Sequence, residues 1–236
     1  MVALIGIVCL LAGYMLFAIF VVDRNVEDRT ICHTMSVKVN AGKDIPYFDS
    51  ADIEAMIEDA GLNPIGGSMA EIGTWEIEDL LRQDRSIRKA ECYKTVDGVL
   101  KIEVWQRTPL MRVMSNTGDY YLDNEGEVMP VPKNLAVCVA LASGFIDEDY
   151  ARNELYRLAL YLREHKEWGQ EIEQIYVHRN KDIEIVPRKG DHRVLVGRFE
   201  DFEDNLKKLP LFYEKGLDKI GWNRYSLINL KYKDRV

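Results

Sequence analysis

The residue types that most often perform catalysis or bind metals are few and widely spaced in this sequence. It contains four histidines, His33, His165, His178 and His192, but neither a His-Glu-x-x-His nor a Cys-x-x-Cys motif. A phosphate-binding glycine loop and the Gly-x-Ser-x-Gly motif of a nucleophile elbow are also missing from the sequence. We therefore predict no enzyme activity, no metal site and no cofactor.

Carboxylates offer two weaker signals of chemistry. The segment from Asp123 to Gly126 faintly resembles a calcium-binding loop, but alternating acidic ligands and a glutamate at the twelfth loop position are absent. An ordinary turn is the better interpretation. The 39 acidic residues could include the carboxylate pair of a glycoside hydrolase, but no pair stands out. His165 lies beside Glu164, Lys166 and Glu167, and we expect it to be exposed near a helix end.

The composition is that of a protein with a folded core and an acidic surface. The chain has 236 residues, of which 47% are hydrophobic, and its formal net charge is −8. A chain of this length forms one or two domains, and the acidic balance argues against nucleic acid as a partner. The charge is unevenly distributed, because residues 1–22 contain no charged side chain.

This charge-free segment predicts a transmembrane helix over residues 1–22. A helix of that length reaches about 33 Å, which is enough to cross a hydrocarbon layer of about 30 Å. A cleaved signal peptide and a buried core helix are the alternatives. A signal peptide is disfavoured because no Lys or Arg precedes the segment and no small-residue cleavage site ends it. The flanking charges do not orient the chain, since residues 23–29 contain two arginines among three acids.

Cysteine usage is typical of packing and not of a disulfide framework. Cys9 lies in the predicted anchor, which leaves Cys32, Cys92 and Cys138 at wide spacing. These three can form at most one bridge, and small apolar packing is the favoured interpretation.

The elements that follow have the order strand, helix, helix, strand, strand. After a polar connector at 23–34, residues 35–39 alternate like a strand. Asp49 and Ser50 are expected to cap a helix that ends at Gly61, and Thr74 is expected to cap a second helix. Strands at 87–96 and 99–107 flank Asp97-Gly98, which predicts a type I′ hairpin turn.

Pro109 marks the start of a second, β-rich region. Its features are a hairpin around 123–126, a buried strand at 137–141, a helix from Asp147 to about Gly169, strands at 172–177, 183–186 and 194–196, a helical segment at 202–214 interrupted by Pro210, and a last strand at 225–232. The predicted fold class is therefore α+β, with two or three helices in the β-rich domain.

Three local patterns in this order resemble one known family. They are Ile-Glu-Val-Trp-Gln-Arg-Thr-Pro-Leu-Met-Arg-Val at 102–113, Tyr-Tyr-Leu-Asp-Asn-Glu-Gly-Glu-Val at 120–128 and Leu-Ile-Asn-Leu-Lys-Tyr at 227–232. The chain resembles the FtsQ/DivIB family of bacterial cell-division proteins, which carry an anchor, a POTRA domain and a β domain. The resemblance implies a transmembrane helix at 1–22, a connector at 23–34, a POTRA-like domain at 35–108 and a β domain at 109–236.

The same resemblance implies a function in assembly. Family members are non-enzymatic, single-pass scaffolds of the inner membrane at the division septum, with the soluble body outside the cytoplasm. They link early and late division proteins, bind FtsB-like and FtsL-like partners and help control septal peptidoglycan synthesis. Two alternatives remain open: a POTRA-bearing protein of outer-membrane assembly or export, and a membrane-anchored extracytoplasmic hydrolase.

The resemblance also places a partner-binding site on the last strand and the helix before it. A strand at a sheet edge can pair with a strand of another chain through its free backbone groups. The candidate residues are Ser226, Ile228, Leu230, Lys231, Tyr232 and Asp234, together with Leu211, Phe212 and Tyr213. For Ile228 and Leu230, burial in the core is the favoured interpretation.

Overall fold

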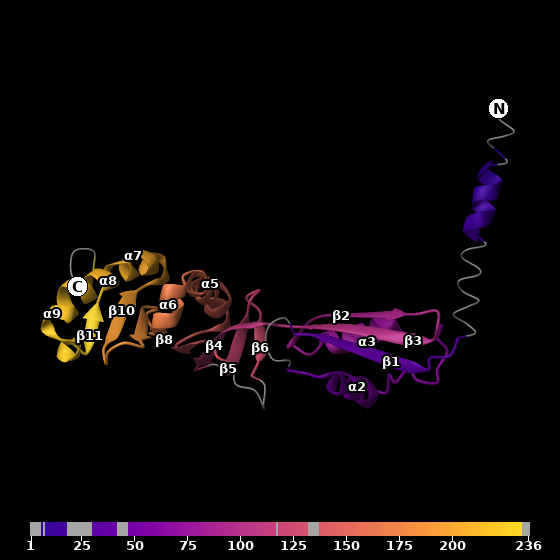
Figure 1. The fold of residues 1–236 in the computed structure, drawn as a ribbon, viewed down its shortest axis with the longest axis horizontal. Helices are drawn as coiled ribbons and strands as arrows, with labels where there is room; N and C mark the ends of the chain where they lie inside the picture. Colours follow the sequence, from indigo (N-terminus) through magenta and orange to yellow (C-terminus); the bar gives the residue numbers. More distant parts are fainter. Residues whose placement is uncertain are drawn as a thin grey trace. The chain divides into compact units, whose positions relative to one another are not determined.

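The computed structural model describes residues 6, 8–17, 30–41, 47–116, 118–131 and 137–232. The chain divides into two compact units, Met1–Gln106 and Arg107–Val236 (Figure 1). Residues 8–17 are helical. The predicted anchor at 1–22 lies partly outside the described residues, and none of the helices formed by the described residues is long and apolar enough to span a bilayer.

The first unit confirms the predicted order of elements. It consists of β1 (Thr34–Asn40), α2 (Ser50–Asp59), α3 (Thr74–Arg82), β2 (Ile87–Lys94) and β3 (Val99–Gln106). The sheet order is β1-β3-β2, with β1 parallel and β2 antiparallel to β3. Alternation along β3 buries Leu100, Ile102 and Val104 against the two helices.

Both helices of the first unit begin for local chemical reasons. The Asp49 side chain accepts a hydrogen bond from Asp52 N–H, and the Asp52 side chain accepts one from Asp49 N–H, which completes a capping box. Gly61 has a φ of +73°, as the prediction of a helix end requires. The second cap is one residue from the predicted position, because Gly73 precedes α3 and Thr74 is its first helical residue.

The hairpin between β2 and β3 has a different turn from the predicted type I′. Gly98 has a φ of +77°, whereas Asp97 does not have a positive φ. The reason is that the Val99 carbonyl accepts two hydrogen bonds from Thr95, one from its backbone N–H (3.0 Å) and one from its hydroxyl (2.7 Å). This pairing closes a three-residue loop, which needs one left-handed residue and not two.

The second unit is built on one eight-stranded sheet. Its strands are β4 (Pro109–Ser115), β5 (Gly118–Asp123), β6 (Val128–Pro130), β7 (Ala140–Gly144), β8 (Ile172–Val177), β9 (Ile183–Pro187), β10 (Arg193–Gly197) and β11 (Leu227–Asn229). Their order in the sheet is β11-β10-β9-β8-β7-β4-β5-β6. The last strand along the chain is therefore an edge strand of the sheet.

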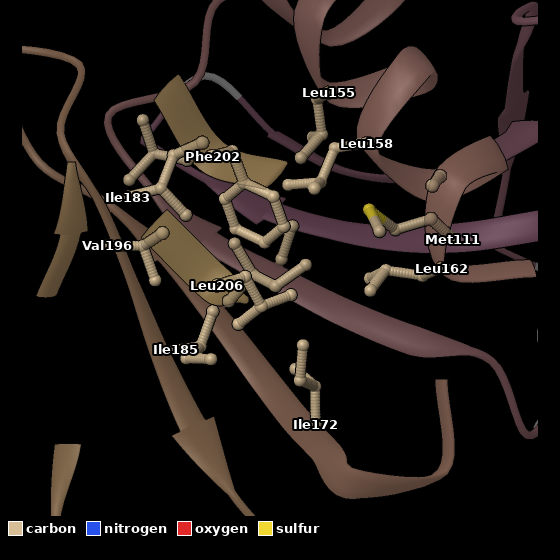
Figure 2. Packing of buried hydrophobic residues seen from close by; sticks show 14 of the residues in the cluster. Met111, Leu155, Leu158, Leu162, Ile172, Ile183, Ile185, Val196, Phe202 and Leu206 are labelled. Carbon is tan, nitrogen blue, oxygen red and sulfur yellow. The ribbon is translucent and has the colours of Figure 1, made fainter. Parts of the chain in front are cut away.

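Helical segments supply the other layer of this unit. They are α4 (Glu148–Tyr150), η1 (Ala151–Leu155), α5 (Tyr156–Glu164), α6 (Lys166–Glu171), η2 (Phe199–Asp201), α7 (Phe202–Leu206), α8 (Lys208–Phe212), η3 (Tyr213–Leu217), α9 (Asp218–Ile220) and η4 (Trp222–Arg224). Figure 2 shows side chains of η1, α5 and α7, including Leu158 and Phe202, directed toward strand residues such as Ile183 and Val196. The mixed α+β fold class is confirmed.

Three boundaries in the second unit differ from the sequence-based expectation. The predicted strand at 137–141 begins only at Ala140, where β7 starts to pair with β4. The helix expected to reach Gly169 ends at Glu164, because His165 has a ψ of +82°. His165 is half-buried and not exposed, and its ring stacks on Tyr161 with centroids 4.1 Å apart. The last strand is three residues long instead of eight.

In the turn from Asp123 to Gly126, the Asp123 carboxylate is bonded to groups of the protein itself. Asp123 is fully buried, and its Oδ1 accepts hydrogen bonds from the backbone N–H groups of Glu125 (2.8 Å) and Glu127 (2.7 Å). Its Oδ2 lies 2.6 Å from Arg107 Nη1. Both carboxylate oxygens therefore have protein partners, which supports the interpretation as an ordinary turn.

Candidate protein-binding edge

The candidate site begins with the position of β11 at the sheet edge. On one side β11 pairs in parallel with β10, with Arg193 opposite Leu227 and Leu195 opposite Asn229. Among the described residues, no further strand pairs with its other side. The expected edge position of the last strand is thus the one observed.

The register shows which backbone groups face outward. Arg193 N–H donates to the Ser226 carbonyl (3.0 Å), and Leu230 N–H donates to the Leu195 carbonyl (2.9 Å). In a parallel ladder alternate residues face the same neighbour, so the backbone of Ile228 also faces β10. The N–H and C=O groups of Leu227 and Asn229 therefore face away from β10, toward the open side of the strand.

The open side ends at Lys231, two residues beyond Asn229. The N–H of Lys231 donates to the Oδ1 of Asn229 at 3.1 Å, so a local side chain already satisfies that donor. The edge that another chain can pair with is consequently short and carries four backbone groups, two from Leu227 and two from Asn229.

A buried carboxylate holds the end of β11 in place. Lys231 Nζ donates to Asp182 Oδ2 at 2.7 Å, and the Asp182 side chain is 6% exposed. Burial alone would raise the pKa of Asp182, but the hydrogen bonds from Lys231 and Asn180 outweigh burial and hold this pKa below its usual range. Asp182 is therefore charged at neutral pH and ties the segment after β11 to the start of β9.

A second lysine fastens the same strand end to the helical layer. Lys208 Nζ donates to the carbonyls of Leu230 (3.2 Å) and Tyr232 (3.1 Å) and to Asn205 Oδ1 (2.7 Å). Asn205 is buried and donates in turn to the Val196 carbonyl at 2.8 Å. These bonds fix the end of an edge strand of only three residues to the helical layer.

The structure separates the predicted strand residues into two groups. Ile228 is 3% exposed and Leu230 is fully buried, so both side chains belong to the hydrophobic core. Ser226 is exposed, and Tyr232 is 60% exposed. Lys231 is engaged with Asp182 as described above, and Asp234 lies outside the described residues.

The predicted helix residues lie at the end of α8 and the start of η3. Leu211 is 52% exposed, whereas Phe212 and Tyr213 are half-buried against the core. The Tyr213 hydroxyl oxygen is 2.9 Å from His192 Nε2, and burial raises the pKa of Tyr213. Burial also lowers the pKa of His192, which keeps this buried imidazole neutral at pH 7.

Sequence reasoning missed Leu227 and Asn229, the two residues whose backbone faces outward. Alternation along 225–232 indicates which side chains share a face, but it does not say which neighbour the backbone groups meet. Lys208 and Asp182 were also missed, since each lies 22 residues or more along the chain from the groups that it holds at the end of β11. Among the described residues, no group of three His, Cys, Asp or Glu side chains could hold a metal ion.

Comparisons with known proteins agree with this two-unit arrangement. Residues 108–236 match the family model described as FtsQ/DivIB, C-terminal related, and residues 30–105 match a POTRA-like domain. One similar solved structure is the major extracytoplasmic domain of the trans isomer of the bacterial cell-division protein DivIB from Geobacillus stearothermophilus. It has 18% sequence identity and a TM-score of 0.31, covering 48% of this chain and 96% of that one.

No curated protein matches the chain. The FtsQ/DivIB match spans more than half of the sequence and contains the whole eight-stranded sheet with its open edge. The chain therefore belongs to the FtsQ/DivIB family of bacterial cell-division proteins.

Proposed function

We propose that this protein is a non-enzymatic, membrane-anchored scaffold of the division machinery. In this proposal residues 1–22 cross the inner membrane and the two folded units lie outside the cytoplasm at the septum. The scaffold links early and late division proteins and helps control septal peptidoglycan synthesis. Its direct partners are FtsB-like and FtsL-like single-pass proteins.

The observation that carries this proposal is the supported, open edge of β11. An extended segment of a partner can pair with the N–H and C=O groups of Leu227 and Asn229 and add a ninth strand to the sheet. Because Lys231 and Lys208 hold the strand end in place, the edge is already ordered before a partner arrives, which lowers the entropic cost of binding.

Exposed side chains around the edge would supply selectivity. Leu227 is 44% exposed and Tyr232 is 60% exposed, and Leu211 lies exposed on the preceding helix. We assign partner contact to these three side chains and to Ser226. Ile228 and Leu230 contribute by anchoring the strand in the core, and Lys231 contributes by positioning it.

The POTRA-like first unit alone would also fit a protein of outer-membrane assembly or export. The family match of residues 108–236 favours cell division over that alternative.

The test is binding of purified full-length protein, reconstituted in lipid nanodiscs, to the FtsB-like and FtsL-like proteins of the same bacterium. We expect a stable complex with at least one of them. Failure to bind either partner, with the protein shown by circular dichroism to be folded, would refute the proposed function.

A further inference from the structure

A small apolar cavity lies in the second unit, where α6, β8, β9 and α8 meet. Its volume is about 270 Å³. Seven of its lining residues are apolar or aromatic: Trp168, Ile172, Ile185, Pro187, Leu209, Pro210 and Tyr213. Small-molecule sites usually begin at about 300 Å³, so this cavity is of a size that suits one large side chain.

The mouth of the cavity carries a net negative charge. Glu167 and Glu171 both line it, are exposed and are four residues apart on α6. Across the described residues, neither carboxylate takes part in an ion pair. The lining cation, Lys189, already has its Nζ over the Trp222 ring at 3.9 Å from the centroid. The contact leaves the charge of Lys189 in place, so the two glutamates and this lysine give the lining a net charge of −1 toward an incoming group.

The cavity walls are held by contacts that do not depend on an occupant. The Arg188 N–H donates to the Glu171 carbonyl at 2.7 Å, which joins the end of α6 to the chain after β9. Tyr213 is hydrogen-bonded to His192, and its ring lies 4.8 Å from Trp222. Trp222 lies five positions before Leu227, so one wall of the cavity packs against the segment that leads into β11.

We propose that this cavity is a second docking point, which binds one large apolar side chain flanked by lysine or arginine on a partner protein. The inference rests on the proposed scaffold function and adds a side-chain anchor to the backbone pairing at β11. Burial of the apolar side chain supplies affinity, as aromatic anchors in pockets commonly do at protein interfaces. The two glutamates select a basic neighbour and disfavour an acidic one.

The experiment measures binding of labelled synthetic peptides to the full-length protein by fluorescence anisotropy. The probe is acetyl-Lys-Lys-Phe-Lys-Lys-amide. It is compared with two other peptides, one in which Ala replaces Phe and one in which Glu replaces every Lys. We expect the Phe–Lys peptide to bind at least tenfold tighter than either comparison peptide. Equal affinities for the three peptides would overturn the proposal.

A matched pair of variants locates the binding. Glu167→Lys with Glu171→Lys reverses the charge at the cavity mouth and should weaken the Phe–Lys peptide at least tenfold. Glu54→Lys with Glu58→Lys makes the same charge change at the same spacing at two exposed positions of α2 and should leave binding unchanged. Equal losses in both variants would mean nonspecific charge attraction and would overturn the assignment to the cavity.

These results are separable from the test of function. If the FtsB-like or FtsL-like partner binds while the peptides do not discriminate, the scaffold function stands and the cavity assignment fails. If the peptide binds as expected while neither partner does, the cavity assignment stands and the proposed function fails.

Discussion

Replacing Leu227 with proline tests the open edge at the level of single backbone groups. Proline lacks the N–H donor, and the register directs the Leu227 N–H away from β10. Proline is tolerated in edge strands when the missing donor would face solvent. The Leu227→Pro variant should therefore keep the sheet intact and lose partner pairing.

The expected magnitudes differ between stability and binding. No bond between β10 and β11 is lost, and the Leu227 side chain is 44% exposed, so we expect the unfolding free energy to fall by less than about 1 kcal/mol. A partner strand loses the hydrogen bond from the Leu227 N–H, worth about 0.5–1.5 kcal/mol. The proline ring also occupies the edge at which the partner strand would pair. Affinity for the partner should therefore fall roughly tenfold or more.

The matched control is Ile228→Pro, one residue further along. The Ile228 N–H faces β10 and its side chain is 3% exposed, so this change should lower stability by about 3 kcal/mol or more. Urea unfolding and calorimetric titration with the FtsB-like partner would measure both quantities. A Leu227→Pro protein that is fully stable and binds with unchanged affinity would refute pairing at this edge.

Three further predictions concern the surroundings of the edge and the first unit. Lys231→Met should reduce stability by about 1.5 kcal/mol at pH 7, the lower end for a charge-assisted hydrogen bond because Lys231 is 40% exposed. Since the folded-state pKa of Asp182 is depressed, this contribution exists above the unfolded pKa of about 4 and is lost as pH falls through the folded value. The variant and the parent protein should therefore differ less in urea unfolding at pH 3, and an equal difference at both pH values would contradict the role of Asp182. Tyr232→Glu should weaken partner binding without changing the melting temperature, because the ring is 60% exposed; a large drop in melting temperature would argue for a core role instead. Burial raises the pKa of Cys92 to about 12, so iodoacetamide at pH 8 should modify it only after unfolding, and labelling of Cys92 in the native protein by mass spectrometry would contradict this environment.

Elements whose ends are set by neighbouring residues could be predicted from the sequence. The Asp49 cap and the Gly61 termination act within one helical turn, and both were found where the pattern places them. The hairpin at Asp97-Gly98 was also correctly located. Its turn type was wrong because the decisive contact, from the Thr95 hydroxyl to the Val99 carbonyl, is a detail of pairing that the dipeptide does not encode.

Boundaries set by tertiary contacts were less predictable. The apolar run at 137–141 suggests a strand, yet β7 exists only where its backbone meets β4 and β8, from Ala140 onward. Likewise, the pattern at 225–232 supports eight residues of strand. The last bond to β10 is the one from the Leu230 N–H to the Leu195 carbonyl, and the chain beyond that bond is held by Lys208 and Asp182 instead.

In the candidate site, too, some features could be predicted from the sequence and others depend on contacts between distant residues. The position of the last strand at an edge follows from the family resemblance. The assignment of outward-facing backbone to Leu227 and Asn229 depends on parallel pairing with β10, which no local pattern specifies. The cavity is formed by side chains from segments between Glu167 and Tyr213, and only folding brings them together.

Amide hydrogen exchange at β11 tests the central claim most directly. The full-length protein would be compared alone and in complex with its FtsB-like or FtsL-like partner, with exchange followed at each backbone amide. Pairing at the edge predicts that the amides of Leu227 and Asn229 become strongly protected, whereas the amide of Ile228, already directed at β10, changes little. A stable complex in which the Leu227 and Asn229 amides exchange as fast as in the free protein would contradict the claim.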